Sequence, residues 1–265
     1  MWQRKKKPVV GVFGFSGCAG DQLAIIHMED ELIDFFTSAD IKFYHMAQSH
    51  QEVDHVDIAL VEGSINTSKQ EAELKEVREK ADIVVALGTC AAYGGIQFLG
   101  DDEKEFNERM QYVYGKDGKV PEFLDMVGQP QGARPISDFI QVDFTVPGCP
   151  VAKENLVPIY TKLISDLQPV KYPYSVCLEC KYQGNDCFLL HGKYCLGPIT
   201  SAGCNARCPS LNVSCVGCFG PFEAANYDSL IDKLKEIGLS EEEVIRKIMM
   251  FGGSIAKEAL GGLKK

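Results

Sequence analysis

The chain has 265 residues, 45% of them hydrophobic, which is enough to bury the core of one large or two modest domains. Its 37 acidic and 27 basic residues give a net charge of −10, which excludes binding to nucleic acid or to an anionic membrane by overall electrostatic attraction. The one basic run, Arg4 to Lys7, is too short to reverse this balance and indicates a disordered tail.

Targeting signals are absent from the sequence. It contains no signal-peptide pattern, no twin-arginine pair and no apolar stretch of about 18 residues, so we expect a soluble cytoplasmic protein without membrane insertion. Eleven cysteines are the compositional excess. An odd number without a secretory signal argues against a disulfide framework and favours metal or redox chemistry in a reducing compartment.

The first half alternates strand-like and helix-like segments. Short apolar runs rich in branched residues predict strands buried on both faces, at 8–14, 41–46, 56–62, 82–88 and 142–146. The pattern over 21–36 predicts an amphipathic helix, and 69–81 predicts a charged surface helix that begins at Thr67 or Ser68. This alternation predicts an α/β fold with a parallel, doubly wound sheet and right-handed crossovers.

Three cysteines follow predicted strands. Cys18 comes after the first, Cys90 after DIVVALGT, and Cys149 after VDFTVPG, each close to a glycine. The carboxyl ends of parallel strands meet at one edge of a sheet, so the fold can gather thiols that are far apart in sequence. Singly, each is readily explained as a buried core thiol. As a trio at equivalent strand ends, they are better explained as metal ligands.

Residues 96–141 form an insertion rich in glycine, proline and charge, for which a covering or partner-facing role is the mildest interpretation. A proline-broken linker follows at about 167. After the cysteine-rich part, 226–238 and 240–253 predict helices. The second of these begins with a Ser240–Glu243 capping box and ends at Gly252 and Gly253.

Eight cysteines crowd into the 42 residues from Cys177 to Cys218, with a C-x-x-C pair at each end. Four thiolates satisfy one tetrahedral zinc or one [4Fe-4S] cluster, so eight make two sites. Dividing them by sequence proximity gives one set of Cys177, Cys180, Cys187 and Cys195, and another of Cys204, Cys208, Cys215 and Cys218. Spacing alone does not choose between zinc and iron–sulfur.

These motifs carry a resemblance. The pieces GCAGD, GTCAAYGG and VPGCP, followed by CLGPITSAGC and PSLNVSCVGCFGP, resemble the small, electron-transferring subunit of [NiFe] hydrogenases across most of 8–222. The first half is also similar to the iron–sulfur subunit beside the quinone site of respiratory complex I, which shares the flavodoxin-like domain. That relative lacks the second cysteine block.

The resemblance implies three [4Fe-4S] clusters and a flavodoxin-like domain at 8–166, a cysteine-rich domain at 167–222 and a helical extension at 223–265. The proximal cluster would use Cys18, Cys90 and Cys149, with Asp21 at the position of the fourth ligand. The medial cluster would use the Cys204 to Cys218 set and the distal cluster the Cys177 to Cys195 set. No residue of this chain need be a general acid or a nucleophile.

The resemblance also implies partners. Dihydrogen would be oxidised reversibly at the nickel–iron site of a separate large subunit, and a flavin- or iron–sulfur-bearing subunit would accept the electrons. The exported members of the family carry a histidine at the distal cluster and a cysteine-poor medial one. This chain has cysteine at those places, so it looks more like the cytosolic multi-subunit members, such as sulfhydrogenases and the enzymes that feed heterodisulfide reductase, deazaflavin or NAD(P) modules.

Asp21 departs from the family pattern, which has a second cysteine there. A carboxylate can ligate iron, and an aspartate occurs at this place in the deazaflavin-reducing members, so we hypothesise that Asp21 is the fourth ligand. The alternative is that Asp21 only complements the macrodipole of the helix that it begins. His191, among the cysteines of a complete set, is expected to face solvent. Glu62, at a strand end, is a candidate for a proton path or a subunit contact.

Three rival functions remain open from the sequence. One is a zinc-stabilised interaction module on a flavodoxin-like scaffold, and another is an electron-transfer subunit of a complex-I-like oxidoreductase. The third is flavin binding in the first half, which a cysteine–aspartate turn serves poorly because it offers little to a phosphate.

Overall fold

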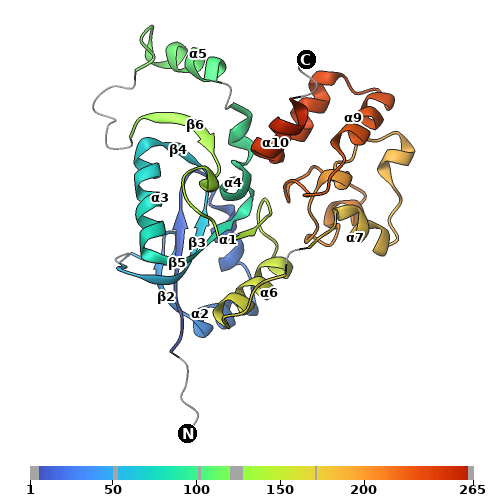
Figure 1. Cartoon of the computed structure of the whole chain (residues 1–265). Coiled ribbons are helices and arrows are strands. Elements are labelled where there is room, and N and C mark those ends of the chain that lie inside the picture. Colours follow the sequence, from blue (N-terminus) through green and yellow to red (C-terminus); the bar gives the residue numbers. More distant parts are fainter. Residues whose placement is uncertain (1–5, 50–52, 101–102, 120–127, 171, 262–265) are drawn as a thin grey trace.

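A computed structural model describes residues 6–49, 53–100, 103–119, 128–170 and 172–261. Arg4 and Lys5 of the basic run, and parts of the predicted insertion and linker, lie outside the described residues. Figure 1 shows the sheet with its helices beside a second part built mostly of loops and short helices. Within the described ranges, no helix combines the length and the hydropathy needed to cross a bilayer.

A five-stranded parallel sheet, in the order β2-β1-β3-β5-β7, organises the first part. The bounds of its strands are Val9–Gly14 (β1), Asp40–Tyr44 (β2), Val56–Glu62 (β3), Ala81–Leu87 (β5) and Phe144–Val146 (β7). The five predicted strands and the α/β class are confirmed. Val10 aligns with Ile58, and Leu87 with Val146, so the carboxyl ends of the four strands from β1 to β7 lie along one edge.

Helices cover both faces of the sheet. Helices α1 (Gly20–Ile26), α2 (Glu31–Ser38) and α6 (Lys153–Ile164) pack one face, where Ile25, Phe35 and Tyr160 join the core. Helix α3 (Ser68–Lys80) packs the other face. The side chain of Thr67 accepts a hydrogen bond from the backbone N–H of Gln70, so the predicted start of this helix is confirmed.

The single helix predicted over 21–36 is wrong, because two helices occupy this stretch. The backbone turns between α1 and α2, and Glu29 takes the left-handed conformation with φ of 59°. Met28, in the turn, is only 1% exposed and belongs to the core beneath the helices. Burying a methionine side chain contributes about 1.5–3 kcal/mol, which offsets the cost of about 1–2 kcal/mol for a left-handed residue.

The predicted insertion contains more regular structure than its sequence suggests. It holds the 3₁₀ helix η1 (Ile96–Gly100), helix α5 (Glu103–Tyr114), strand β6 (Pro130–Arg134) and the 3₁₀ helix η3 (Ile136–Asp138). Strand β6 pairs antiparallel with β4 (Ile65–Thr67) to form a second, two-stranded sheet. Figure 1 shows α5 at the end of the molecule beyond this small sheet.

The second part contains the eight clustered cysteines. Its elements are α7 (Val176–Tyr182), η4 (Phe188–His191), η5 (Gly197–Ile199), α8 (Arg207–Ser210), α9 (Tyr227–Glu236) and α10 (Glu241–Leu260). Helices α9 and α10 share a core with η5. The division into three domains stays a prediction, since the last helix packs against both parts of the molecule.

Helix α10 begins with the predicted capping box, in which Ser240 and Glu243 exchange hydrogen bonds. The predicted end at Gly252 and Gly253 is wrong, because the helix resumes and runs to Leu260 after a kink at Gly253. Gly253 has φ of 56°, and a Cβ atom there would overlap the carbonyl of Tyr93. The kink therefore lets α10 pack closely on α4 (Gly88–Tyr93), the helix that carries Cys90.

Candidate metal centres

The first group of thiols lies at one edge of the central sheet. Cys18 follows β1, Cys90 lies in α4 directly after β5, and Cys149 follows β7. Burial, followed by the nearby charges of Cys149, Asp21, Cys18 and Glu62, raises the pKa of the Cys90 thiol to about 12. Burial, with Asp21 and Cys18, also raises the pKa of Cys149. The structure therefore brings these three thiols into electrostatic contact, and we refer to them with Asp21 as the strand-end group.

Asp21 is a buried member of this group, with 6% of its surface exposed. Its Oδ1 accepts a hydrogen bond of 2.7 Å from the backbone N–H of Val151. A Cβ atom on Gly88 would overlap its Oδ2, so this oxygen faces the turn that leads into Cys90. Burial raises the pKa of Asp21 to about 7, although the Val151 hydrogen bond lowers it, and Glu62 adds a further increase. A desolvated carboxylate among thiols is typical of a metal ligand.

Glu62 performs the helix-start role that was the alternative for Asp21. Its Oε1 accepts a hydrogen bond of 3.2 Å from the backbone N–H of Asp21, and its Oε2 accepts one of 3.3 Å from that of Gln22. These are free amides of the first turn of α1, so the Glu62 carboxylate complements the helix macrodipole there. The Asp21 carboxylate instead bonds to the turn after Cys149. The structure thus weakens the purely helical explanation of Asp21.

Replacing Gly88 with alanine is expected to destabilise the fold by about 3 kcal/mol and to lower the metal content of the strand-end group. Gly88 has φ of 80°, and its new methyl group would displace the Asp21 carboxylate. Gly184 has φ of 71°, and a Cβ atom there would meet no other atom within 4 Å, so Gly184→Ala carries only the backbone cost of about 1–2 kcal/mol. Denaturant unfolding and metal analysis of both variants check this, and equal losses would contradict it.

The set of Cys177, Cys180, Cys187 and Cys195 gathers around the start of α7 and the ends of η4. Burial, followed by the charges of the other three cysteines, raises the pKa of Cys177 to about 11. Burial also raises the pKa of Cys195, and Cys180 and Cys187 contribute to this increase. The four thiols that sequence proximity groups together are therefore also neighbours in space. His191 is exposed at the end of η4, as expected.

The set of Cys204, Cys208, Cys215 and Cys218 lies between the Cys177 to Cys195 set and the sheet. Burial, with Cys204, Cys208 and Cys149 as the charged neighbours, raises the pKa of Cys218 to about 12. Burial raises the pKa of Cys215 as well, where Cys195 and Cys218 are the neighbouring thiols. Cys218 thus adjoins the strand-end group, and Cys215 adjoins the other set. The three groups follow one another through the molecule.

Two residues that sequence analysis missed hold the two four-cysteine sets against each other. Glu179, within the first C-x-x-C pair, accepts hydrogen bonds from the backbone N–H groups of Gly203 and Ala206, at 2.9 and 3.2 Å. Gly197 lies between the sets, and a Cβ atom there would be 3.2 Å from the sulfur of Cys177. Neither role has a signal in the sequence, because each depends on residues brought together by folding.

Backbone amides point at several of the sulfurs. The thiol of Cys195 accepts backbone hydrogen bonds from Gly197 and Cys215, and that of Cys215 accepts one from Gly217. These hydrogen bonds lower the thiol pKa because they favour the thiolate form, which is the form that binds metal. Hydrogen bonds to sulfur are also a means by which proteins set the potential of iron–sulfur clusters.

A cavity of about 160 Å³ is lined by all four thiols of the Cys204 to Cys218 set and by Cys149. One water molecule accounts for about 30 Å³ of liquid, so the cavity exceeds what a single ion needs. Its other lining residues are largely apolar, among them Val151, Val176 and Phe219. This donor set fits a polynuclear group that sits in a dry, thiol-lined space.

Another trio of ligand-type side chains lies apart from the thiol groups. Ligand atoms of His55, Asp57 and Asp82, at the amino ends of β3 and β5, lie within 4.8 Å of one another. His55 and Asp82 are exposed, and none of the three is a predicted ligand.

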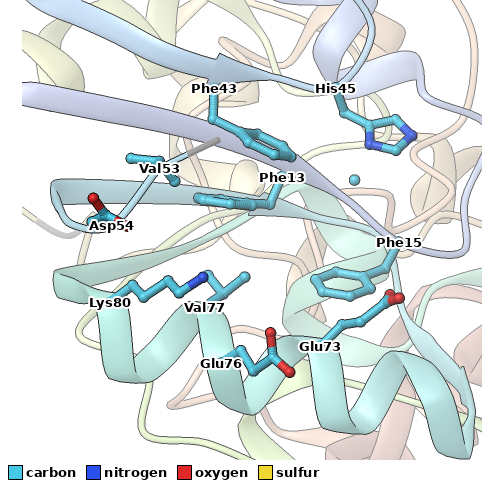
Figure 2. Close-up of a pocket in the computed structure, with 11 residues that line it drawn as sticks. Phe13, Phe15, Phe43, His45, Val53, Asp54, Glu73, Glu76, Val77 and Lys80 are labelled. Atoms are coloured by element: carbon cyan, nitrogen blue, oxygen red, sulfur yellow. The ribbon is translucent and has the colours of Figure 1, made fainter. Parts of the chain in front are cut away.

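A larger groove, of about 480 Å³, lies on the α3 face of the sheet and contains none of the predicted ligands. Figure 2 shows the stacked rings of Phe13 and Phe43, 4.4 Å apart, with Glu73 and Glu76 of α3 beside them. The groove exists because the described residues between β2 and β3 form no helix to cover this face. Three carboxylates, of Asp54, Glu73 and Glu76, line it against one lysine, Lys80, so its charge does not favour a flavin phosphate and it gives no support to flavin binding.

Known proteins match the chain closely. It is 37% identical over 243 residues to sulfhydrogenase 2 subunit delta of Pyrococcus furiosus. This match covers 91% of this chain and 98% of that protein. It is 34% identical to a subunit of the F420-non-reducing hydrogenase vhu of Methanocaldococcus jannaschii, over 80% of this chain and 81% of the relative. An actinobacterial-type NiFe-hydrogenase structure from Ralstonia eutropha H16 shares the fold, with a TM-score of 0.56 at 17% identity over 98% of this chain and 92% of that one.

The parallel sheet with thiols at its strand ends and the cysteine-rich part beside it define the class of [NiFe] hydrogenase small subunits. Proteins of this class are parts of oxidoreductases whose catalytic site lies on another chain. The chain belongs to the family described as NADH ubiquinone oxidoreductase, 20 Kd subunit, whose model matches residues 18–163. The resemblance drawn from the motifs is confirmed. The eight clustered cysteines lie beyond this match, in the part shared with the hydrogenase subunits.

Proposed function

We propose that the chain is the iron–sulfur electron-transfer subunit of a [NiFe] hydrogenase that oxidises dihydrogen reversibly. It would connect the nickel–iron site of a large subunit to a flavin- or cluster-bearing acceptor subunit. The observation that carries the proposal is the succession of three thiol groups from the strand ends to the far side of the cysteine-rich part, with Cys149 next to Cys218 and Cys195 next to Cys215.

Three [4Fe-4S] clusters fit these groups. The proximal ligands would be Cys18, Asp21, Cys90 and Cys149, the medial ligands Cys204, Cys208, Cys215 and Cys218, and the distal ligands Cys177, Cys180, Cys187 and Cys195. Such clusters, when bound, accept and release single electrons. The chain supplies the thiolates, the amides that hydrogen-bond them and the apolar surroundings that exclude water.

The exposure of the two outer groups supports the proposed partner subunits. Cys18 and Cys149 are exposed at the sheet edge, and Cys187 is exposed at the other end of the cysteine-rich part. Exposed ligands at both ends suit a chain that meets one electron-transfer partner at each end. The relatives named above as a sulfhydrogenase and an F420-non-reducing hydrogenase are subunits of such assemblies, which supports the proposal. The cytoplasmic location stays a prediction.

Metal analysis of the anaerobically purified protein tests the proposal. We expect about twelve iron atoms and as many acid-labile sulfides per chain, with a broad brown absorbance. Cys187→Ala, which alters one exposed thiol, is expected to lose about four irons and leave the other two groups loaded. Two zinc atoms, no sulfide and a colourless sample would instead support the zinc-stabilised interaction module.

A further inference from the structure

Thr89 joins the strand-end group to the cysteine-rich part. It precedes Cys90 at the start of α4, and only 1% of its surface is exposed. Its hydroxyl donates a hydrogen bond of 2.5 Å to the backbone carbonyl of Cys218, which lies 129 residues further along the chain. The same hydroxyl accepts a hydrogen bond of 3.1 Å from the backbone N–H of Gly148. This buried hydroxyl thus connects the turn that carries Cys149 to the turn that carries Cys218. The residue after Thr89 is Cys90.

The backbone around Thr89 strengthens this junction. The N–H of Thr89 donates a hydrogen bond of 2.8 Å to the carbonyl of Gly148, the residue before Cys149. The backbone of Cys149 in turn hydrogen-bonds the thiol of Cys218. Cys149 belongs to the strand-end group and Cys218 to the next set, so a direct hydrogen bond links one ligand of each proposed cluster.

The chemistry of the hydroxyl explains why threonine is suited to this position. A hydroxyl is both a donor and an acceptor, so a single oxygen satisfies the Cys218 carbonyl and the Gly148 amide. Valine has the same shape but can do neither, whereas serine keeps both hydrogen bonds and lacks only a methyl group. Because buried backbone groups are rarely left unpaired, loss of the hydroxyl would push the Cys218 turn away from the sheet.

We propose that Thr89 is a positioning residue that sets the separation between the proximal and medial clusters. The inference rests on the proposed function and goes beyond it, because it names the residue that fixes one spacing in the series. Thr89 acts through the backbone of Gly148 and Cys218, and it touches neither cluster's sulfur itself. The separation between redox centres governs how strongly they interact, so this hydroxyl matters to electron transfer without being a ligand.

The test compares Thr89→Val with Thr89→Ser in the iron-loaded complex. Iron content is measured first, and both variants are expected to match the unaltered protein. The magnetic interaction between the reduced proximal and medial clusters is then read from the splitting of their electron paramagnetic resonance signals. We expect a smaller splitting in Thr89→Val, where the turns separate, and the original splitting in Thr89→Ser. Unchanged splitting in Thr89→Val would overturn the inference while leaving the proposed function intact.

A measurement on the unaltered protein covers the case in which Thr89→Val does not assemble. Hydrogen exchange at the backbone amides of Thr89 and Gly148 is expected to be as slow as in strand β5, because the junction opens only with the sheet. Rapid exchange at these two amides would overturn the inference. Absence of iron from the unaltered protein would overturn the proposed function, and the inference with it.

Discussion

Cys90→Ala is expected to remove about four irons from the chain and to slow hydrogen-driven reduction of an artificial dye by more than about 100-fold. Cys90 is partly buried in α4, and its thiol has the other members of the strand-end group as charged neighbours. Alanine offers no ligand, and the helix holds the position away from bulk water. Iron and sulfide analysis, followed by dye reduction under hydrogen, measures both effects in the purified complex.

Two variants serve as controls for this prediction. Gln97 Oε1 lies 3.5 Å from the Cys90 sulfur and is not a proposed ligand, so Gln97→Ala is expected to keep the iron and to slow dye reduction at most about tenfold. Tyr182, two residues after Cys180 in the sequence, is 90% exposed, and Tyr182→Ala is expected to change neither quantity. Full iron content and full rate in Cys90→Ala would show that Cys90 is a core thiol and not a ligand.

The sheet was predictable from the sequence because its strands carry their own signal. Runs such as VDIALVE and ADIVVAL are mostly apolar and rich in branched residues, which is typical of a buried parallel strand. The break between α1 and α2 gave no such signal. It is made by Glu29, a residue type that rarely adopts a left-handed conformation, and it is held there by the burial of Met28.

The short strands β4 and β6 were missed for a different reason. They have only three and five residues, contain polar side chains, and pair across more than 60 residues of sequence. Periodicity over a short window cannot detect such a pair. The helix after Gly253 was missed because a glycine pair usually ends a helix, whereas here the close approach of Tyr93 requires glycine at a kink.

The candidate site, like the fold, was predictable from the sequence only in part. The cysteine sets could be proposed because thiols are rare and their spacing is informative. The contacts that connect the sets could not, because Glu179 and Thr89 bond backbone groups of distant turns. Gly197 gave no signal either, because what matters there is its close approach to the sulfur of Cys177. A threonine that bonds a carbonyl 129 residues away is, in the sequence, indistinguishable from a threonine that begins a helix.

Asp21 is expected to weaken the metal-free chain as the pH rises. Its pKa is 3.8 in an unperturbed chain and about 7 in the fold, where burial is the main cause and Val151 and Glu62 act in opposite directions. The folded state therefore holds this proton more tightly than the unfolded state between these two values. The resulting penalty is absent below about pH 4, grows up to about pH 7 and is complete above it.

The magnitude follows from the same shift. Between pH 5 and pH 8 the free energy of unfolding of the metal-free chain is expected to fall by about 3 kcal/mol on account of Asp21. Asp21→Asn keeps an oxygen for the Val151 amide and cannot ionise, so this part of the pH dependence is expected to vanish in it. Urea unfolding of both chains across this range measures the difference, and parallel curves would mean that Asp21 carries no such penalty.

A bound cation would make the ionised Asp21 carboxylate stabilising instead of destabilising. The penalty in the metal-free chain is therefore relevant to a role of Asp21 as a ligand. A buried carboxylate that costs stability when unpaired becomes favourable beside iron, and the Val151 hydrogen bond holds its other oxygen in place. Asp21→Cys is therefore expected to keep the iron content and to raise the potential of the proximal cluster, because the harder oxygen ligand favours ferric iron. Asp21→Asn is expected to lose part of the iron of the strand-end group. Unchanged spectra, potential and iron content in both variants would leave Asp21 only its hydrogen bond to the turn after Cys149.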